Sequence, residues 1–217
     1  IGDQLEPNGT LNPATYRLIG KVYSQFAERE AWARPSTPVV EAAVVTPESP
    51  RVEHQIPESV MGAVQMLEEL AIQFDVIDPG MSMDAYKLVI LPDDLVVCGG
   101  FQKKLEDFVA KGGKVIACAK GGQNQEGEYP SCFGAKSAGP QNVYPDFLIA
   151  EGKLAEGLEP ENEYVIYMQG EALEPAGAET ILSARAPYFQ REKDFFCSHR
   201  YTPSAKGEAY PAVLQKG

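Results

Sequence analysis

The side chains that commonly catalyse reactions are few in this chain and far apart. Its two histidines, His54 and His199, would have to serve any Ser/His/Asp or Cys/His arrangement, and no G-x-S-x-G sequence is present. Cys197 and His199 are both able to bind a metal, but a zinc site needs three or four ligands at recognisable spacing. We therefore predict a packed thiol beside a hydrogen-bonded imidazole at this place, with no metal and no cofactor.

A second candidate is the carboxylate pair Asp93-Asp94, which follows an apolar run. Such a pair could bind Mg²⁺ or transfer protons, although adjacent side chains usually point in different directions. The glycine pairs Gly99-Gly100 and Gly121-Gly122 lack both patterns that cradle phosphates. The residues thus predict no complete catalytic set.

A third group of residues is aromatic and lies near the end of the chain. Its members alternate with three arginines: Tyr188, Phe189, Phe195, Phe196 and Tyr201 with Arg185, Arg191 and Arg200. Aromatic residues and arginine are enriched in protein–protein interfaces. The same composition also suits core beneath a long loop, so both interpretations remain open.

Composition limits the partners that the chain can have. The formal net charge of −12 repels phosphate backbones and anionic lipid, which argues against nucleic acid and membrane surfaces. No apolar run approaches the roughly 20 residues that span a bilayer. The four cysteines form no C-x-x-C pair, and the apolar content of 44% makes disulfides unnecessary, so we predict a reducing cytoplasm.

Apolar runs that alternate with helical patterns predict the framework. Four strands are expected at residues 39–45, 74–77, 87–92 and 114–119, with helices after His54 and after Gly100. This order predicts a right-handed parallel sheet covered on both faces. The second half differs: residues 121–140 predict a long loop, and further strands are expected at residues 164–167, 179–184 and 209–214.

The first 38 residues follow a different pattern. Residues 1–7 are typical of a strand end running into a helix, which suggests a piece cut from a larger protein. Asn12-Pro13 marks a helix start, and an apolar stripe continues to about Trp32 without an obvious partner nearby. Residues 33–38 predict a linker.

Two sets of residues resemble known families. Residues 2–9, with Leu11-Asn12-Pro13-Ala14-Thr15-Tyr16 and Ile19-Gly20-Lys21-Val22-Tyr23, resemble the end of the catalytic barrel in bacterial α-L-fucosidase-like, β-galactosidase-related glycoside hydrolases. From about Val39 the chain resembles the β-galactosidase trimerisation domain, a flavodoxin-like module related to class I glutamine amidotransferases. The supporting segments are residues 88–93, 109–116, 187–191 and 196–199.

The resemblance implies an α/β fold, a flavodoxin-like three-layer α/β/α sandwich with a mostly parallel sheet, preceded by a helix left over from a TIM barrel. It implies two domains: residues 1–38 as the end of the barrel, and residues 39–217 as an amidotransferase-like domain. The implied function is that of a non-catalytic module of a carbohydrate-active glycoside hydrolase, which builds a homo-oligomer and supports the active-site mouth. The implied partners are its own barrel and, in the parent protein, a carbohydrate substrate.

Site residues follow from the same resemblance. A nucleophilic cysteine would stand after the fourth strand, where this chain has Lys120, while Cys118 is expected inside the strand as a buried, neutral thiol. No catalytic residue is therefore assigned. Asp3 and Gln4 would point to the mouth of the parent's barrel, where substrates bind.

Two alternatives belong to other classes of protein. One is an amidotransferase- or hydrolase-type enzyme that uses Lys120, Asp94 and His54. The other is a flavodoxin-type module that binds a small ligand, although no phosphate-binding loop supports it.

Overall fold

The computed structural model describes residues 4–47, 56–159, 162–189 and 202–217. The chain divides into two compact units, residues 1–39 and residues 40–217. Each unit is described by itself below.

The first unit is a helix whose start the sequence specifies. Helix α1 (Pro13–Ala27) follows Asn12, whose Oδ1 accepts hydrogen bonds from the backbone N–H of Ala14 at 3.0 Å and of Thr15 at 3.2 Å. A one-turn helix, α2 (Glu30–Ala33), comes next. None of the residues of α1 is buried, and Phe26 is 68% exposed. The apolar side chains of α1 therefore find no cover within this unit.

The second unit begins with a parallel sheet. Its strands are β1 (Ala42–Val45), β2 (Phe74–Ile77), β3 (Leu88–Leu91) and β4 (Lys114–Ala117), in the order β2-β1-β3-β4. Consecutive β1 residues are buried because both faces of the sheet are covered, which explains the nearly continuous apolar run. Strand order reverses between β1 and β3, so their carboxyl ends open a crevice at one rim.

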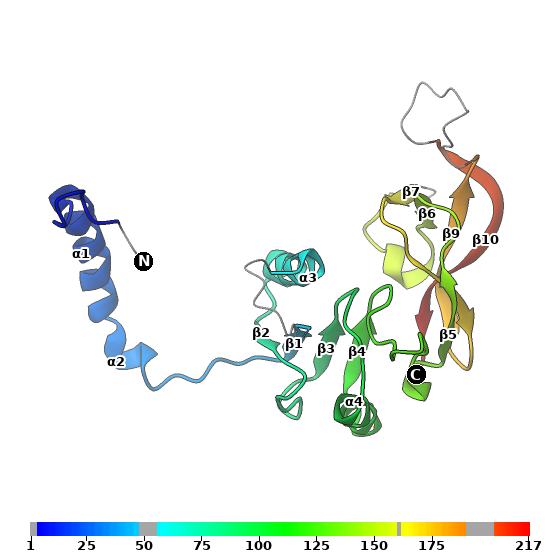
Figure 1. The fold of residues 1–217 in the computed structure, drawn as a ribbon, viewed down its shortest axis with the longest axis horizontal. Helices are drawn as coiled ribbons and strands as arrows, with labels where there is room; N and C mark the ends of the chain where they lie inside the picture. The colour runs from blue at the N-terminus through cyan, green and yellow to red at the C-terminus, as the bar shows by residue number, and fades with distance from the viewer. Residues whose placement is uncertain (1–3, 48–55, 160–161, 190–201) are drawn as a thin grey trace. The chain divides into compact units, whose positions relative to one another are not determined.

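Two helices cover opposite faces of this sheet (Figure 1). Helix α3 (Glu58–Glu69) packs Val60, Ala63 and Leu67 against Val44 and Ile90. Alternation turns the neighbouring strand residues to the other face. There Phe101, Leu105 and Phe108 of α4 (Gly100–Ala110) join a larger buried cluster with Val45, Val89 and Leu91. The parallel part is thus a three-layer α/β/α arrangement.

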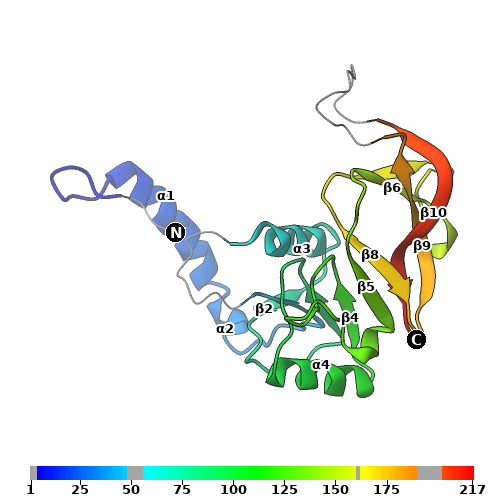
Figure 2. The same cartoon turned by 45° about the vertical axis from the view of Figure 1, so that its right-hand side comes forward.

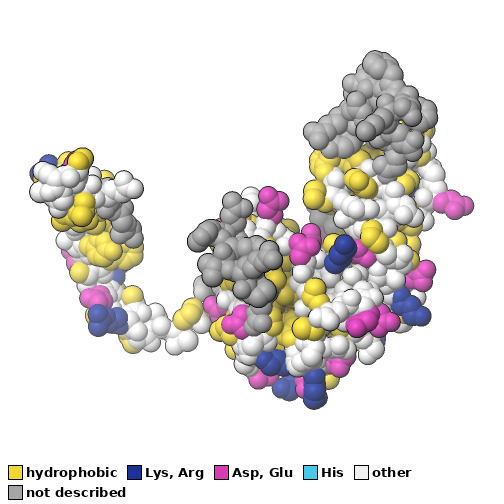
Figure 3. Space-filling view, in the orientation of Figure 1, with side chains coloured by type: hydrophobic (Ala, Val, Ile, Leu, Met, Phe, Trp, Pro, Cys, Tyr) yellow, Lys and Arg dark blue, Asp and Glu magenta, His cyan; other side chains and the backbone are white. Residues whose placement is uncertain are grey.

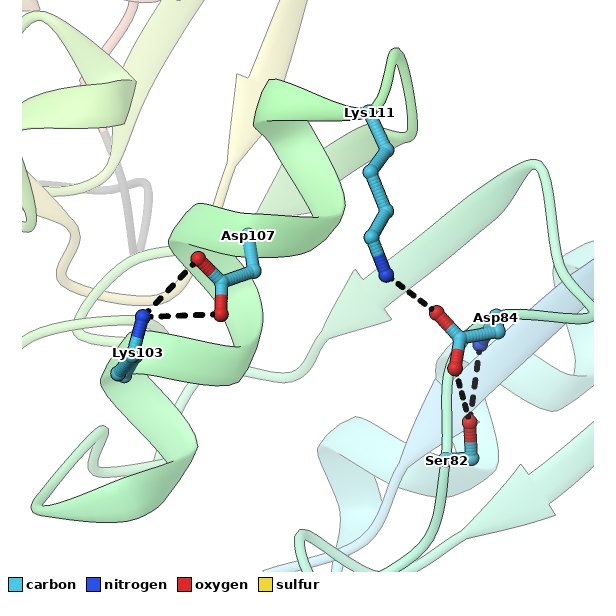
Figure 4. A network of polar contacts seen from close by, with 5 residues as sticks. All are labelled: Ser82, Asp84, Lys103, Asp107 and Lys111. Atoms are coloured by element: carbon cyan, nitrogen blue, oxygen red, sulfur yellow. Dashed lines mark hydrogen bonds and ion pairs between the residues drawn. The ribbon is translucent and has the colours of Figure 1, made fainter.

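The outer surface of α4 carries exposed ion pairs (Figure 4). Lys111 Nζ lies 2.9 Å from Asp84 Oδ1, and Lys103 Nζ lies 3.1 Å from Asp107 Oδ2, one helical turn away. Ser82 Oγ donates to Asp84 at 2.9 Å. Because all of these groups are exposed, solvent screens their attraction and each pair contributes little to the stability of the fold.

The remaining strands of the second unit are antiparallel (Figure 2). Strands β5 (Ala135–Pro140) and β8 (Glu171–Pro175) pair with each other. A four-stranded sheet has the order β10-β9-β6-β7. Its members are β6 (Asp146–Ile149), β7 (Glu163–Ile166), β9 (Glu179–Pro187) and β10 (Ser204–Gln215). The 3₁₀ turns η1 (Ser131–Phe133) and η2 (Gly152–Ala155) complete the described elements.

A buried carboxylate ties three strands of the four-stranded sheet together. Glu163 on β7 accepts from Arg185 on β9 at 2.8 Å and from Ser204 on β10 at 3.2 Å. Its second oxygen lies 3.0 Å from Lys206 Nζ. Burial alone would raise the pKa of Glu163, but the hydrogen bonds from these three side chains together hold it below the ordinary value.

The sequence-based expectations were met unevenly. The four parallel strands and both covering helices are confirmed; β2 has the expected bounds, and β1, β3 and β4 are shorter than expected. The interpretation of residues 121–140 as one loop was wrong, because η1 and β5 lie there, and strands β6 and β8 were missed. A mixed α/β fold is therefore present, but the sheet content is not mostly parallel. No helix among the described residues is long and apolar enough to cross a membrane.

Candidate functional site

A polar cavity of about 280 Å³ lies where the turn after β4 meets the two-stranded sheet. The side chains and backbone that line it include Lys120, Gln123, Glu126, Ser137, Gly139 and Glu171. The cavity lies beyond the carboxyl end of the edge strand β4, and none of its lining residues in the described part of the chain directly follows β1 or β3, between which the strand order reverses. Two regions that are distant in sequence therefore build one site.

The turn that carries Lys120 is tightly constrained. Ala119 has a φ of 45°, in the left-handed region that side chains other than glycine rarely adopt. The Tyr129 hydroxyl donates to the Ala119 carbonyl and holds it there. A Cβ at Gly121 would lie 2.3 Å from the Pro92 carbonyl oxygen, so only glycine permits this approach. Backbone strain of this kind is concentrated at functional sites.

A hydrogen-bond network joins the cavity's two sides. Gln123, which is only 7% exposed, donates through Nε2 to Glu171 Oε2 at 3.1 Å. Ser137 Oγ donates to the same oxygen at 2.6 Å and accepts from the Gly139 N–H at 3.0 Å. Among the described residues no partner reaches the buried Glu171 Oε1. The network thus ends in an acceptor that the described residues leave without a donor.

Lys120 follows the strained residue directly. Its side chain takes part in none of the ion pairs found among the described residues, and it is exposed at the cavity. The cavity therefore presents an ammonium group and two carboxylates, those of Glu126 and Glu171.

Cys118 lies one residue beyond the end of β4, so its expected place within the strand was wrong. The thiol is half-buried, and burial raises its pKa, with a smaller contribution from the nearby Asp93. A thiol with a raised pKa is protonated at neutral pH and is a poor nucleophile.

The carboxylates of the expected pair follow β3 and are both exposed. Partial burial, and then the charge of Asp94, raise the pKa of Asp93. Neither lines the polar cavity. No group of three or more His, Cys, Asp or Glu side chains placed to hold a metal occurs among the described residues.

Several predicted residues fall outside the described part of the chain. They are Asp3, His54, Arg191, Phe195, Phe196, Cys197, His199, Arg200 and Tyr201. Gln4 is described and exposed in the first unit. The aromatic group is represented by Tyr188, 63% exposed, and Phe189, 44% exposed. Of the predicted site residues that the structure describes, only Lys120 lines the cavity. The other side chains there, such as Gln123 and Glu171, were not predicted.

Gln123, Ser137 and Glu171 were not anticipated. Glu171 lies 48 residues from Gln123 and 34 from Ser137, so no local spacing could bring these residues together. The only sequence signal was their position in and after a segment interpreted as a loop.

Comparison with solved structures gives close matches of fold. α-L-Fucosidase isoenzyme 2 from Paenibacillus thiaminolyticus is 33% identical with a TM-score of 0.85, and the match covers 99% of this chain and 33% of that one. The β-galactosidase from Bacillus circulans sp. alkalophilus is 17% identical with a TM-score of 0.68, covering 98% and 32%. The cold-adapted β-galactosidase from Rahnella sp. R3 is 18% identical with a TM-score of 0.64, covering 83% and 30%.

The chain therefore spans about a third of the length of these solved relatives. No curated protein sequence matched it. The model of the β-galactosidase trimerisation domain family matches residues 42–188, which is more than half of the chain. The chain thus belongs to the β-galactosidase trimerisation domain family.

Proposed function

We propose that this chain is the non-catalytic C-terminal module of a longer, carbohydrate-active glycoside hydrolase, and that it builds the homo-oligomer and supports the active-site mouth. The observation that carries the proposal is the family match over residues 42–188. The chemistry of Cys118, the thiol nearest the expected nucleophile position, agrees with a non-catalytic role. Its raised pKa makes it a poor nucleophile.

Residues 1–38 are proposed to be the end of the parent's catalytic barrel, and residues 39–217 the appended α/β domain. The exposed apolar side chains of α1 support this division, because a helix on the outside of a barrel packs such a stripe against the strands. Asp3 and Gln4 would then stand at the barrel mouth and contact a carbohydrate substrate. The parent is proposed to act in the cytoplasm.

The α/β domain is proposed to be flavodoxin-like and related to class I amidotransferases. The strand order β2-β1-β3-β4 agrees with the first four strands of the flavodoxin order. Lys120 would occupy the place of the lost nucleophile. The strained backbone of Ala119, immediately before it, supports this assignment.

The association surface is proposed to lie on the four-stranded antiparallel sheet. Hydrophobic side chains are exposed over β6 and β7 (Figure 3). Leu154, 55% exposed, and Leu158, 45% exposed, line an apolar hollow of about 90 Å³, and Met168, 75% exposed, follows β7 in sequence. Strand β7 is the edge of this sheet among the described residues, and an edge strand can pair with a further strand. A second copy of this chain is the partner that the family match supports.

Sedimentation equilibrium of the 217-residue chain tests the proposal. We expect a mass that is a multiple of the 23.6 kDa protomer, and we expect Met168→Glu to reduce it towards the protomer. Met66→Glu, on the exposed side of α3, is the matched control and should leave the mass unchanged. A chain that is monomeric at every concentration, or hydrolysis of nitrophenyl glycosides by the chain alone, would refute the proposal.

A further inference from the structure

The polar cavity beside Lys120 has features of a binding site that a purely structural module does not need. It combines a strained turn, a network anchored on the buried Gln123, and a buried carboxylate oxygen that finds no partner in the part of the chain that the structure describes. An unsatisfied buried acceptor is costly, so a donor from outside the protein would stabilise this geometry. We propose that the cavity binds a small neutral polyhydroxylated molecule of monosaccharide size.

The charges that line the cavity disfavour ionic ligands. One ammonium, that of Lys120, stands against two carboxylates, those of Glu126 and Glu171, so the lining repels phosphate and other anions. The same ammonium opposes a divalent cation, and no three-ligand cluster occurs among the described residues. Hydroxyl groups suit the lining because each one both donates to a carboxylate and accepts from an ammonium or an amide.

The size of the cavity sets the scale of the ligand. Its volume of about 280 Å³ lies just below the roughly 300–1,000 Å³ of sites for drug-sized molecules. A single sugar ring is of that scale, whereas an oligosaccharide or a dinucleotide is too large. Glycine backbone at Gly127 and Gly139 lets a ligand approach the wall closely.

The ligand's position follows from the network. Glu171 Oε2 accepts two hydrogen bonds, from Gln123 and Ser137, which hold the carboxylate at the cavity wall. The terminal torsion of a glutamate side chain is soft, so a ligand hydroxyl that compensates for weaker contacts at Oε2 would draw the buried Oε1 towards the cavity. Lys120, which also lines the cavity, donates to a second hydroxyl. The ligand would then bridge the turn after β4 and strand β8.

The choice of sugars as probes, though not the site itself, rests on the proposed carbohydrate-active parent. ¹H–¹⁵N NMR titrations of the full 217-residue chain with D-galactose, L-fucose and D-glucose provide the test. We expect at least one sugar to give saturable shifts of the Gly127 and Gly139 amides, with a dissociation constant of about 1 mM. L-Alanine and inorganic phosphate, as zwitterionic and anionic probes, should give none.

Two variants with matched controls locate the site. Glu171→Gln keeps an acceptor oxygen for Gln123 and Ser137 but places an amide N–H₂ at the position of Oε1. Lys120→Met removes the ammonium group and keeps a side chain of similar length. Each should weaken sugar binding at least about tenfold, as expected for one lost charge-assisted hydrogen bond. Glu174→Gln on β8 and Lys114→Met on β4, both exposed, should bind as the unaltered chain does.

No saturable shift with any sugar up to about 50 mM would overturn the inference, since a site with the expected dissociation constant of about 1 mM is almost fully occupied at that concentration. Binding that is unchanged in both variants, or saturation by L-alanine or phosphate in place of the sugars, would overturn it equally. The mass measured by sedimentation on the same samples reports on the oligomer alone, so failure of sugar binding and failure of the proposed function are distinguishable.

Discussion

The parallel part of the second unit and its antiparallel part differ in how their apolar residues are covered. Of the 20 buried hydrophobic residues found in the described chain, 17 lie in residues 42–108 and only three, Ile149, Ala178 and Ala184, lie after residue 134. Large hydrophobic side chains are nevertheless exposed in both parts, for example Met66 and Val76 in the parallel part and Leu154 and Met168 in the antiparallel part. The parallel sheet, with a helix on each face, buries a core of its own, and we propose that the antiparallel sheet, with few buried apolar residues, is covered by a second copy of the chain.

The largest effect that we expect from this comparison is on folding stability. Leu91→Ala removes a fully buried side chain from the centre of the parallel sheet and should lower the free energy of unfolding by about 2–5 kcal/mol. Leu154→Ala, at a site 55% exposed, should change it by less than about 0.5 kcal/mol in the monomer. Urea unfolding of dilute protein measures both values, and equal losses would contradict the comparison.

A smaller effect is expected at the buried carboxylate of the antiparallel sheet. Glu163→Gln weakens the contacts with Arg185 and Lys206 and should cost about 1–3 kcal/mol at neutral pH. The pKa of Glu163 is lowered from its ordinary value of 4.5, so the stability that it contributes is present above pH 4.5 and is lost as pH falls through the lower, folded value.

Urea unfolding at neutral pH and near pH 3 checks this prediction, with Glu208→Gln on the exposed side of β10 as the control. The penalty of the Glu163 variant should shrink in acid. A penalty that is equal at both pH values would show that the loss is one of packing and not of charge.

The next effect is expected at a half-buried pair between β10 and β6. Tyr210 donates to Asp146 Oδ2 at 3.0 Å, and burial and the charge of Asp146 raise the pKa of the Tyr210 hydroxyl. Burial also raises the pKa of Asp146, a shift that the Tyr210 hydrogen bond opposes. Tyr210→Phe should therefore cost about 1 kcal/mol at neutral pH.

The stability cost of Tyr210→Phe should depend on pH. A carboxyl with a raised pKa destabilises the fold as pH rises through that pKa, and loss of the Tyr210 donor strengthens this effect. The variant's penalty should thus disappear in acid, when Asp146 is protonated. Tyr188→Phe, at a site 63% exposed, is the control. An undiminished penalty in acid would refute the assigned hydrogen bond.

The smallest effect is expected from removing residues 1–38. These residues belong to the separate first unit, and helix α1 buries none of its side chains. The thermal midpoint of residues 39–217 should therefore equal that of the full chain, while solubility should rise because exposed Leu18 and Phe26 are gone. A lower midpoint in differential scanning calorimetry would show that the units stabilise each other.

How far the sequence predicted the fold depended on the same contrast between the two parts. The strands β1 and β3 were found because burial on both faces demands continuous apolar runs such as Ala42–Val45. Strand β5, of sequence AKSAGP, has neither β-branched residues nor a strong apolar face, and its pairing with β8 forms it. Local pattern alone could not predict such a strand.

The candidate site was predicted in one residue only. Lys120 was singled out by the family resemblance, as the residue at the place of a lost nucleophile after the fourth strand, and not as a ligand-binding residue. Glu171 and Ser137 reach the same cavity through tertiary contacts across the antiparallel pair, which the sequence does not specify locally. The strain at Ala119 has no signal in the sequence, because alanine at a positive φ is a consequence of the surrounding contacts.

Hydrogen–deuterium exchange of the full chain at several dilutions tests most directly whether the antiparallel sheet is the association surface. As concentration rises into the range where the mass increases, we predict slower exchange in residues 163–168 and no change in Leu88–Leu91, the internal reference within the parallel core. Exchange in residues 163–168 that stays constant while the mass grows would contradict the account.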